Sequence, residues 1–144
     1  MSEEVLQSLL NRSVAHVRKQ GKPSGNPEHG SFRCLYRAVD GSSCAAAPFI
    51  TAYDTDMEEM GWGRLASNFP DRVEPAAREH AEFVEVLQSA HDSAARISCE
   101  CDTDFLNVYE RQLASNLAAW NARHEETLTV PPFGWEAADA EVSA

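Results

Sequence analysis

The sequence lacks the features that most directly identify a function. Its 144 residues contain no apolar run near the roughly 18 residues that a membrane-spanning helix requires. They also contain no glycine-rich phosphate loop, no nucleophile-elbow motif and no two-histidine metal motif. These absences exclude the commonest nucleotide-binding and hydrolytic classes, and they favour a protein that is not an enzyme.

An export signal is also missing from the first residues, which are acidic and lead directly into an amphipathic pattern. Four cysteines in a chain without such a signal are expected to stay reduced. We therefore expect a cytoplasmic protein that has no membrane partner.

Basic residues are scarce, since 12 of them stand against 23 acidic ones and give a net charge of −11. Residues 1–53 carry six basic and four acidic side chains, whereas residues 54–144 carry six basic and nineteen acidic ones. Such a field repels nucleic acid and attracts basic protein surfaces. The distribution predicts a partner protein with a basic surface and no direct nucleic-acid binding. Solubility alone is the alternative explanation of the charge.

A β-hairpin is predicted in the first half of the chain. Alternate residues of Phe32–Tyr36 would share one face, and Asp40-Gly41 suits a tight turn. If the hairpin is centred on Val39, Cys34 lies opposite Cys44.

Three segments show the spacing of amphipathic helices. They begin at Ser2, at about residue 75 or 80, and at Thr103, and the last two are joined by Ser98–Asp102. The sequence therefore predicts an α+β fold with an N-terminal helix, a central β-hairpin and two long antiparallel helices. This single domain covers residues 1–126. A partly ordered acidic C-terminal tail follows at residues 127–144, in which Val130, Phe133 and Trp135 could dock and residues 137–144 should be mobile.

Short motifs follow one another along residues 5–124. They are Lys22-Pro-Ser, Cys34-Leu-Tyr-Arg37, Gly41-Ser-Ser-Cys44-Ala, the segment Tyr53–Glu58, Leu87-Gln-Ser-Ala-His-Asp92 and a closing helix from Phe105. In this order they resemble a family of small uncharacterised proteins from tailed bacteriophages and prophages. The resemblance implies a phage context and carries no chemistry. Phages often encode small acidic inhibitors of host defences, which places the expected partner in the host cytoplasm.

The cysteines and one histidine allow other interpretations. Cys34, Cys44, Cys99 and Cys101 could bind zinc, although their spacing differs from that of the usual zinc knuckles. They could equally remain free thiols, or Cys34 and Cys44 could form a cross-strand disulfide. If the helix that carries His91-Asp92 covers the hairpin, this pair could act as acid and base beside Cys34 or Cys44 as nucleophile. A histidine on an apolar helix face is more often a satisfied core group.

We conclude from the sequence that the chain is a non-enzymatic phage accessory protein that binds a host protein. It would be an anti-defence inhibitor, of anti-CRISPR or antirestriction type, that mimics DNA on a nucleic-acid-binding surface and needs no cofactor. The predicted contacts are the clustered acidic residues Asp54, Asp56, Glu58, Glu59, Glu79, Glu82 and Glu85. A zinc-stabilised or thiol-bearing interaction module is the alternative, and a Cys/His enzyme is the third possibility.

Overall fold

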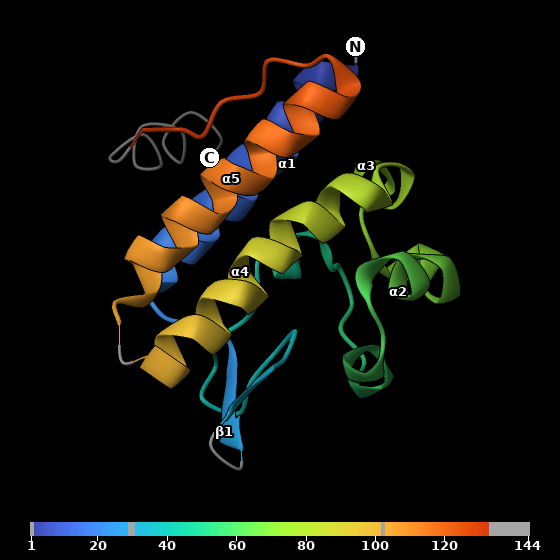
Figure 1. Cartoon of the computed structure of the whole chain (residues 1–144). Coiled ribbons are helices and arrows are strands. Elements are labelled where there is room, and N and C mark those ends of the chain that lie inside the picture. Colours follow the sequence, from blue (N-terminus) through green and yellow to red (C-terminus); the bar gives the residue numbers. More distant parts are fainter. Residues whose placement is uncertain (1, 29–30, 102, 133–144) are drawn as a thin grey trace.

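The computed structural model describes residues 2–28, 31–101 and 103–132, most of which lie in helices (Figure 1). The long helices are α1 (Ser2–Gln20), α4 (Ala81–Cys101) and α5 (Phe105–His124). The short helices are η1 (Ala47–Phe49), η2 (Thr55–Glu59), α2 (Trp62–Asn68), η3 (Pro70–Arg72) and α3 (Pro75–Glu79). The strands are β1 (Gly25–Glu28) and β2 (Ser31–Cys34), which form an antiparallel ribbon.

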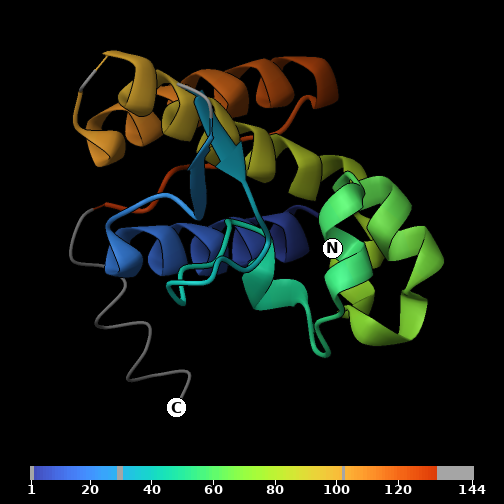
Figure 2. The same ribbon diagram turned by 90° about the horizontal axis from the view of Figure 1, so that it is seen from below.

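The predicted α+β fold with a central β-hairpin is wrong, because the protein is mainly helical and its short ribbon extends from one end of the molecule (Figures 1 and 2). Residues 25–28, which lie outside the predicted hairpin, supply the strand that pairs with β2. The second half of the predicted hairpin leads into η1 instead, and just before η1 the carbonyl of Ala45 accepts a hydrogen bond from the buried Ser13 hydroxyl at 2.8 Å.

Residues 36–44 form a second, shorter turn whose register differs from the prediction. The N–H of Cys44 donates to the carbonyl of Tyr36 at 3.1 Å, so the turn is centred on Asp40. Cys44 is therefore opposite Tyr36 in this turn, while Cys34 pairs with Gly25 in the ribbon. Moving the centre of the turn from Val39 to Asp40 moves the partner of Cys44 by two residues, from Cys34 to Tyr36, and the place opposite Cys34 is taken by β1.

The predicted helices form for the reasons expected from their patterns. The apolar residues of α1 that repeat at helical spacing are buried, namely Leu6, Leu9, Leu10, Val14 and Val17. Glu3 and Glu4 stand in its first turn, where negative charge is favourable. Gly21, with a φ of 73°, ends it in the left-handed conformation typical of a helix C-terminus.

Helices α4 and α5 pack side by side and run antiparallel, as predicted (Figure 1). The predicted interruption at residues 98–102 is wrong, because α4 continues to Cys101. Asp104, rather than Thr103, caps α5 by accepting the N–H of Asn107 at 3.0 Å. Helix α4 also contacts α1, α2, α3 and β2, so it is the common support of the fold. None of the helices in the described residues has both the length and the apolar composition to cross a bilayer.

Ion pairs and hydrogen bonds attach α1 to distant parts of the chain. Arg18, whose side chain is 4 % exposed, donates from Nε and a terminal nitrogen to the two carboxylate oxygens of Glu110 at 2.9 Å each. Glu3 accepts hydrogen bonds from the N–H and the hydroxyl of Thr127. Val130 packs against the core, as expected, whereas Phe133, Trp135 and residues 137–144 lie outside the described residues.

The predicted turn residue Gly41 has a φ of 90°, which side chains rarely adopt. We expect Gly41→Ser to lower the free energy of unfolding by about 1 kcal/mol or more, because Cβ is strained in this conformation. Gly61→Ser is the matched control, since Gly61 has a φ of −69° and nothing within 4 Å of an added Cβ. Urea unfolding of both variants measures the difference. Equal stabilities would mean that the turn tolerates a side chain.

Candidate functional site

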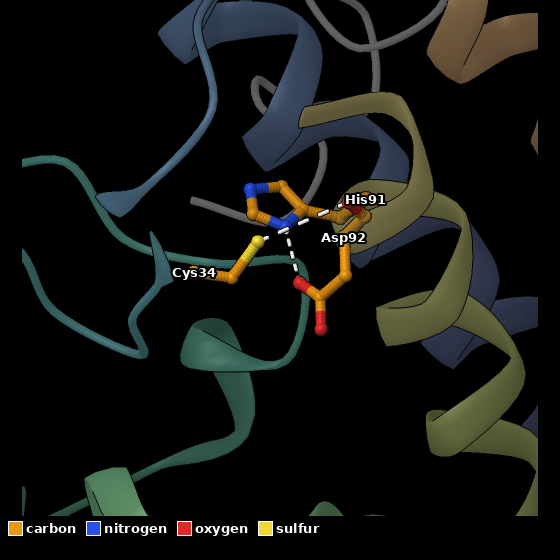
Figure 3. Close-up of side chains that lie close together, drawn as sticks. All are labelled: Cys34, His91 and Asp92. Atoms are coloured by element: carbon orange, nitrogen blue, oxygen red, sulfur yellow. Dashed lines mark hydrogen bonds and ion pairs between the residues drawn. The ribbon is translucent and has the colours of Figure 1, made fainter. Parts of the chain in front are cut away.

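Cys34, His91 and Asp92 come together where β2 meets α4 (Figure 3). One ligand atom of each residue, a sulfur, a ring nitrogen or a carboxylate oxygen, lies within 4.8 Å of the others. This is the constellation expected from the sequence if the His91 helix covers Cys34. It forms although the surrounding hairpin differs from the prediction.

The hydrogen bonds of His91 indicate which ring nitrogen carries the proton of its neutral form. Its Nε2 accepts the backbone N–H of Ser24 at 3.1 Å, so the proton of the neutral ring is on Nδ1. This Nδ1–H donates to the carboxylate of Asp92 at 2.9 Å. The side chain of His91 is completely buried, and Phe105 packs edge-to-face on it at 5.7 Å between ring centroids. His91 is therefore a satisfied core histidine.

The Cys34 thiol is not prepared for nucleophilic attack. Its sulfur faces the backbone carbonyl of Asp92 at 3.9 Å. Burial, and after it the negative charge of Asp92, raise the pKa of the Cys34 thiol far above its ordinary value. His91 is not placed to accept the thiol proton, since its Nδ1 already carries a proton and its Nε2 is occupied by the N–H of Ser24.

The same hydrogen bonds oppose a metal ion, although a thiolate, an imidazole and a carboxylate are donors that suit zinc. A metal bound to Nδ1 would move the ring proton to Nε2, where it would point at the N–H of Ser24. Histidine ligands instead donate their second N–H to a carboxylate, a carbonyl or water. We therefore interpret Cys34, His91 and Asp92 as a structural contact between β2 and α4 rather than as a metal centre, and we call this contact the joint.

The other cysteines of the zinc hypothesis lie elsewhere. Cys44 is completely buried, and burial raises the pKa of its thiol to about 12. Cys99 and Cys101 are exposed in the last turn of α4. All four cysteines are free, and among the described residues only the Cys34 cluster places three possible ligand atoms together.

A hollow of about 410 Å³ lies beside the joint, between the chain after β2, residues 58–62 and α4. Its carboxylates are Glu58, Glu85 and Asp92, while Arg96 is the one basic side chain among the described residues that line it. The Asp92 side chain is 38 % exposed. Glu58 and Glu85 are predicted as contacts from the sequence, whereas Asp92 and Arg96 are not, because only the packing of β2 on α4 brings them to the same hollow.

The predicted acidic contacts divide into two groups. Asp56, Glu59, Glu79 and Glu82 are exposed. Asp54, Glu58 and Glu85 accept backbone N–H groups at 2.7 to 3.0 Å. Of these three residues, Glu58 accepts the most hydrogen bonds, from the N–H groups of Tyr36 and Arg37 and from the hydroxyl of Tyr53. Its substitution would disturb the fold as well as the surface charge.

Comparisons with known proteins do not assign the chain to a class: no protein-family model, curated protein or solved structure matches it. Its function must therefore be inferred from the residues themselves.

The thiols should differ in reactivity. At pH 8 we expect Cys99 and Cys101 to react quickly with Ellman's reagent, and Cys34 and Cys44 roughly a hundredfold more slowly, because the raised pKa values of the buried thiols suppress the thiolate. The double variant Cys99→Ser/Cys101→Ser should lose the fast phase. A fast phase that instead disappears with Cys34→Ser would show an activated thiol.

The protein should also fold without zinc. We expect the melting temperature to be the same in a chelator and in excess zinc, because the ring nitrogens of His91 are both committed. Differential scanning fluorimetry measures it. A rise with zinc that is present in the wild type and absent in Cys34→Ser would overturn this interpretation, since metal binding to a native site stabilises the fold.

Proposed function

We propose that the chain is a non-enzymatic binding protein that engages a basic surface of another protein through the hollow beside α4. The observation that supports this most directly is the placement of three carboxylates around one hollow with a single basic neighbour, Arg96, among the described lining residues. An ionised carboxylate has about four acceptor positions. Glu85 accepts the N–H of Gly63 at 3.0 Å and keeps capacity for an incoming lysine or arginine.

The carboxylates of the hollow are held in place before a partner arrives. Glu58 is fixed by backbone N–H groups, and Asp92 is fixed by His91 and by the side-chain amide of Gln88 at 3.3 Å. Acceptors that are already ordered lose less conformational entropy when they bind. This arrangement favours recognition of a cationic side chain.

The surface around the hollow extends the same charge. Exposed Glu82 is one turn before Glu85 on α4, and exposed Asp56 and Glu59 belong to the η2 segment. With a net charge of −11, these residues support steering toward a basic protein. The resemblance to phage proteins extends the proposal to a host protein, whose nucleic-acid-binding surface the chain would occupy as an anti-defence inhibitor of anti-CRISPR or antirestriction type.

The proposal can be tested on a partner isolated from bacterial lysate with the tagged chain and identified by mass spectrometry. The triple variant Asp56→Asn/Glu82→Gln/Glu85→Gln removes one charge that lines the hollow, at Glu85, and two exposed charges from η2 and the first turn of α4. A glutamine side chain at position 85 can still accept the N–H of Gly63. We expect its association rate to fall roughly tenfold at about 0.05 M salt and the difference to shrink at about 0.5 M salt. Surface plasmon resonance measures both rates.

The matched control is Glu4→Gln/Glu100→Gln/Glu125→Gln, which removes three exposed charges outside the hollow, outside η2 and outside the first turns of α4. We expect its association rate to stay within about twofold of that of the wild type. Equal losses in both variants would show that only total charge matters. No loss in either variant, together with indifference to salt, would reject the acidic surface as the binding site.

A further inference from the structure

The buried joint at His91 fixes the position of the ribbon on the helices. Ser24, whose N–H binds Nε2 of His91, also exchanges hydrogen bonds with Leu35: its hydroxyl donates to the Leu35 carbonyl at 2.7 Å, and the Leu35 N–H donates to its carbonyl at 3.1 Å. Ser24 therefore connects both ends of the ribbon to α4. Leu35 and Tyr36, which follow the ribbon, form one wall of the hollow.

A second proton on His91 is incompatible with this joint. The proton would sit on Nε2 and point at the N–H of Ser24, so that two donors would face each other in a fully buried site. Either His91 stays neutral or the bond to Ser24 breaks. Breaking it releases the buried amide of Ser24 from its acceptor and loosens the chain on either side.

The groups that face His91 come from four elements. Asp92 on α4 receives its Nδ1 proton, and Cys34 on β2 contributes a neutral thiol. From α1, His16 acts on it electrostatically, and burial lowers the pKa of His16 itself. From α5, Phe105 contributes an uncharged ring. Asp92 would stabilise a charged ring, but it cannot remove the conflict at Nε2, which lies on the other side of the imidazole.

We infer that His91 is an acid-sensitive latch: its neutral form holds residues 24–28 and 31–35 on α4, and a second proton detaches these residues and opens the wall of the hollow. The bond to Ser24 is present when the ring carries one proton and is lost when it carries two, because Nε2 then has no lone pair to accept the amide. The latch belongs to the fold alone and does not depend on what the hollow binds.

Hydrogen exchange of the full chain, followed by NMR, tests the latch. As the pH falls from about 7.5 to 5.5, we expect the protection factors of the Ser24 and Leu35 amides to fall, by up to about tenfold for each pH unit, which is the limit for an opening that takes up one proton. The amide of Gly21, which donates to Val17 at the end of α1, should keep its protection. Constant protection at Ser24 and Leu35 over this range would overturn the inference.

Two variants separate His91 from its neighbours. In His91→Gln the side-chain carbonyl can take the place of Nε2 as acceptor and has no proton to gain, so protection should become independent of pH while Asp92 is retained. In His16→Gln the fall should persist. A fall that is unchanged in His91→Gln, or abolished in His16→Gln, would assign the effect to another group.

The tautomer of His91 gives a measurement that does not require the glutamine variant to fold. Long-range ¹H–¹⁵N spectra of the wild type at pH 7.5 should show His91 with its proton on Nδ1. A proton on Nε2 at this pH would contradict the bond from Ser24 and remove the latch.

Discussion

The hydrogen bond from the Ser24 amide to Nε2 of His91 is the constraint on which the arrangement of the first half of the chain depends. A buried amide needs an acceptor, and here the acceptor comes from the middle of α4 rather than from a neighbouring strand. This fixes the ribbon against the helix, and it brings the Cys34 thiol to Asp92. The hollow follows from the same contact, because its walls are α4 and the chain that leaves β2.

The carboxylates of this protein serve two purposes that net charge does not distinguish. Some are structural, such as Glu58 on two backbone amides and Glu110 on Arg18. The ion pair of Glu110 occupies a basic side chain, and Glu74 occupies Arg12 in the same way. An ion pair leaves the net charge unchanged, but its basic side chain no longer neutralises another carboxylate. Exposed carboxylates of α4, such as Glu82 and Glu85, instead contribute negative charge to its surface.

Sequence patterns predicted the helices well, because a repeat of 3.6 residues reports directly which face is buried. They failed for the ribbon, because alternation shows that a segment is extended without showing which segment pairs with it. The sequence predicted that Cys34 lies near His91-Asp92 if the His91 helix covers the extended segment, and these residues do lie together. The role of Ser24 could not be predicted, because a backbone amide leaves no signal in side-chain chemistry.

The contacts of α1 also affect the order in which the molecule can fold. Helices α4 and α5 are joined by a short connection, so they can pair early with little loss of chain entropy. Helix α1 reaches Glu110 and Thr127 only after loops of 92 and 124 residues have closed. Contacts so distant in the sequence raise the contact order of the fold, whereas the contacts of α1 with η1 and α4 join segments that lie nearer along the chain. In a chain emerging from the ribosome, η1 and α4 are thus available to cover the apolar face of α1 before Glu110 and Thr127, which bind its charged side chains, have been synthesised.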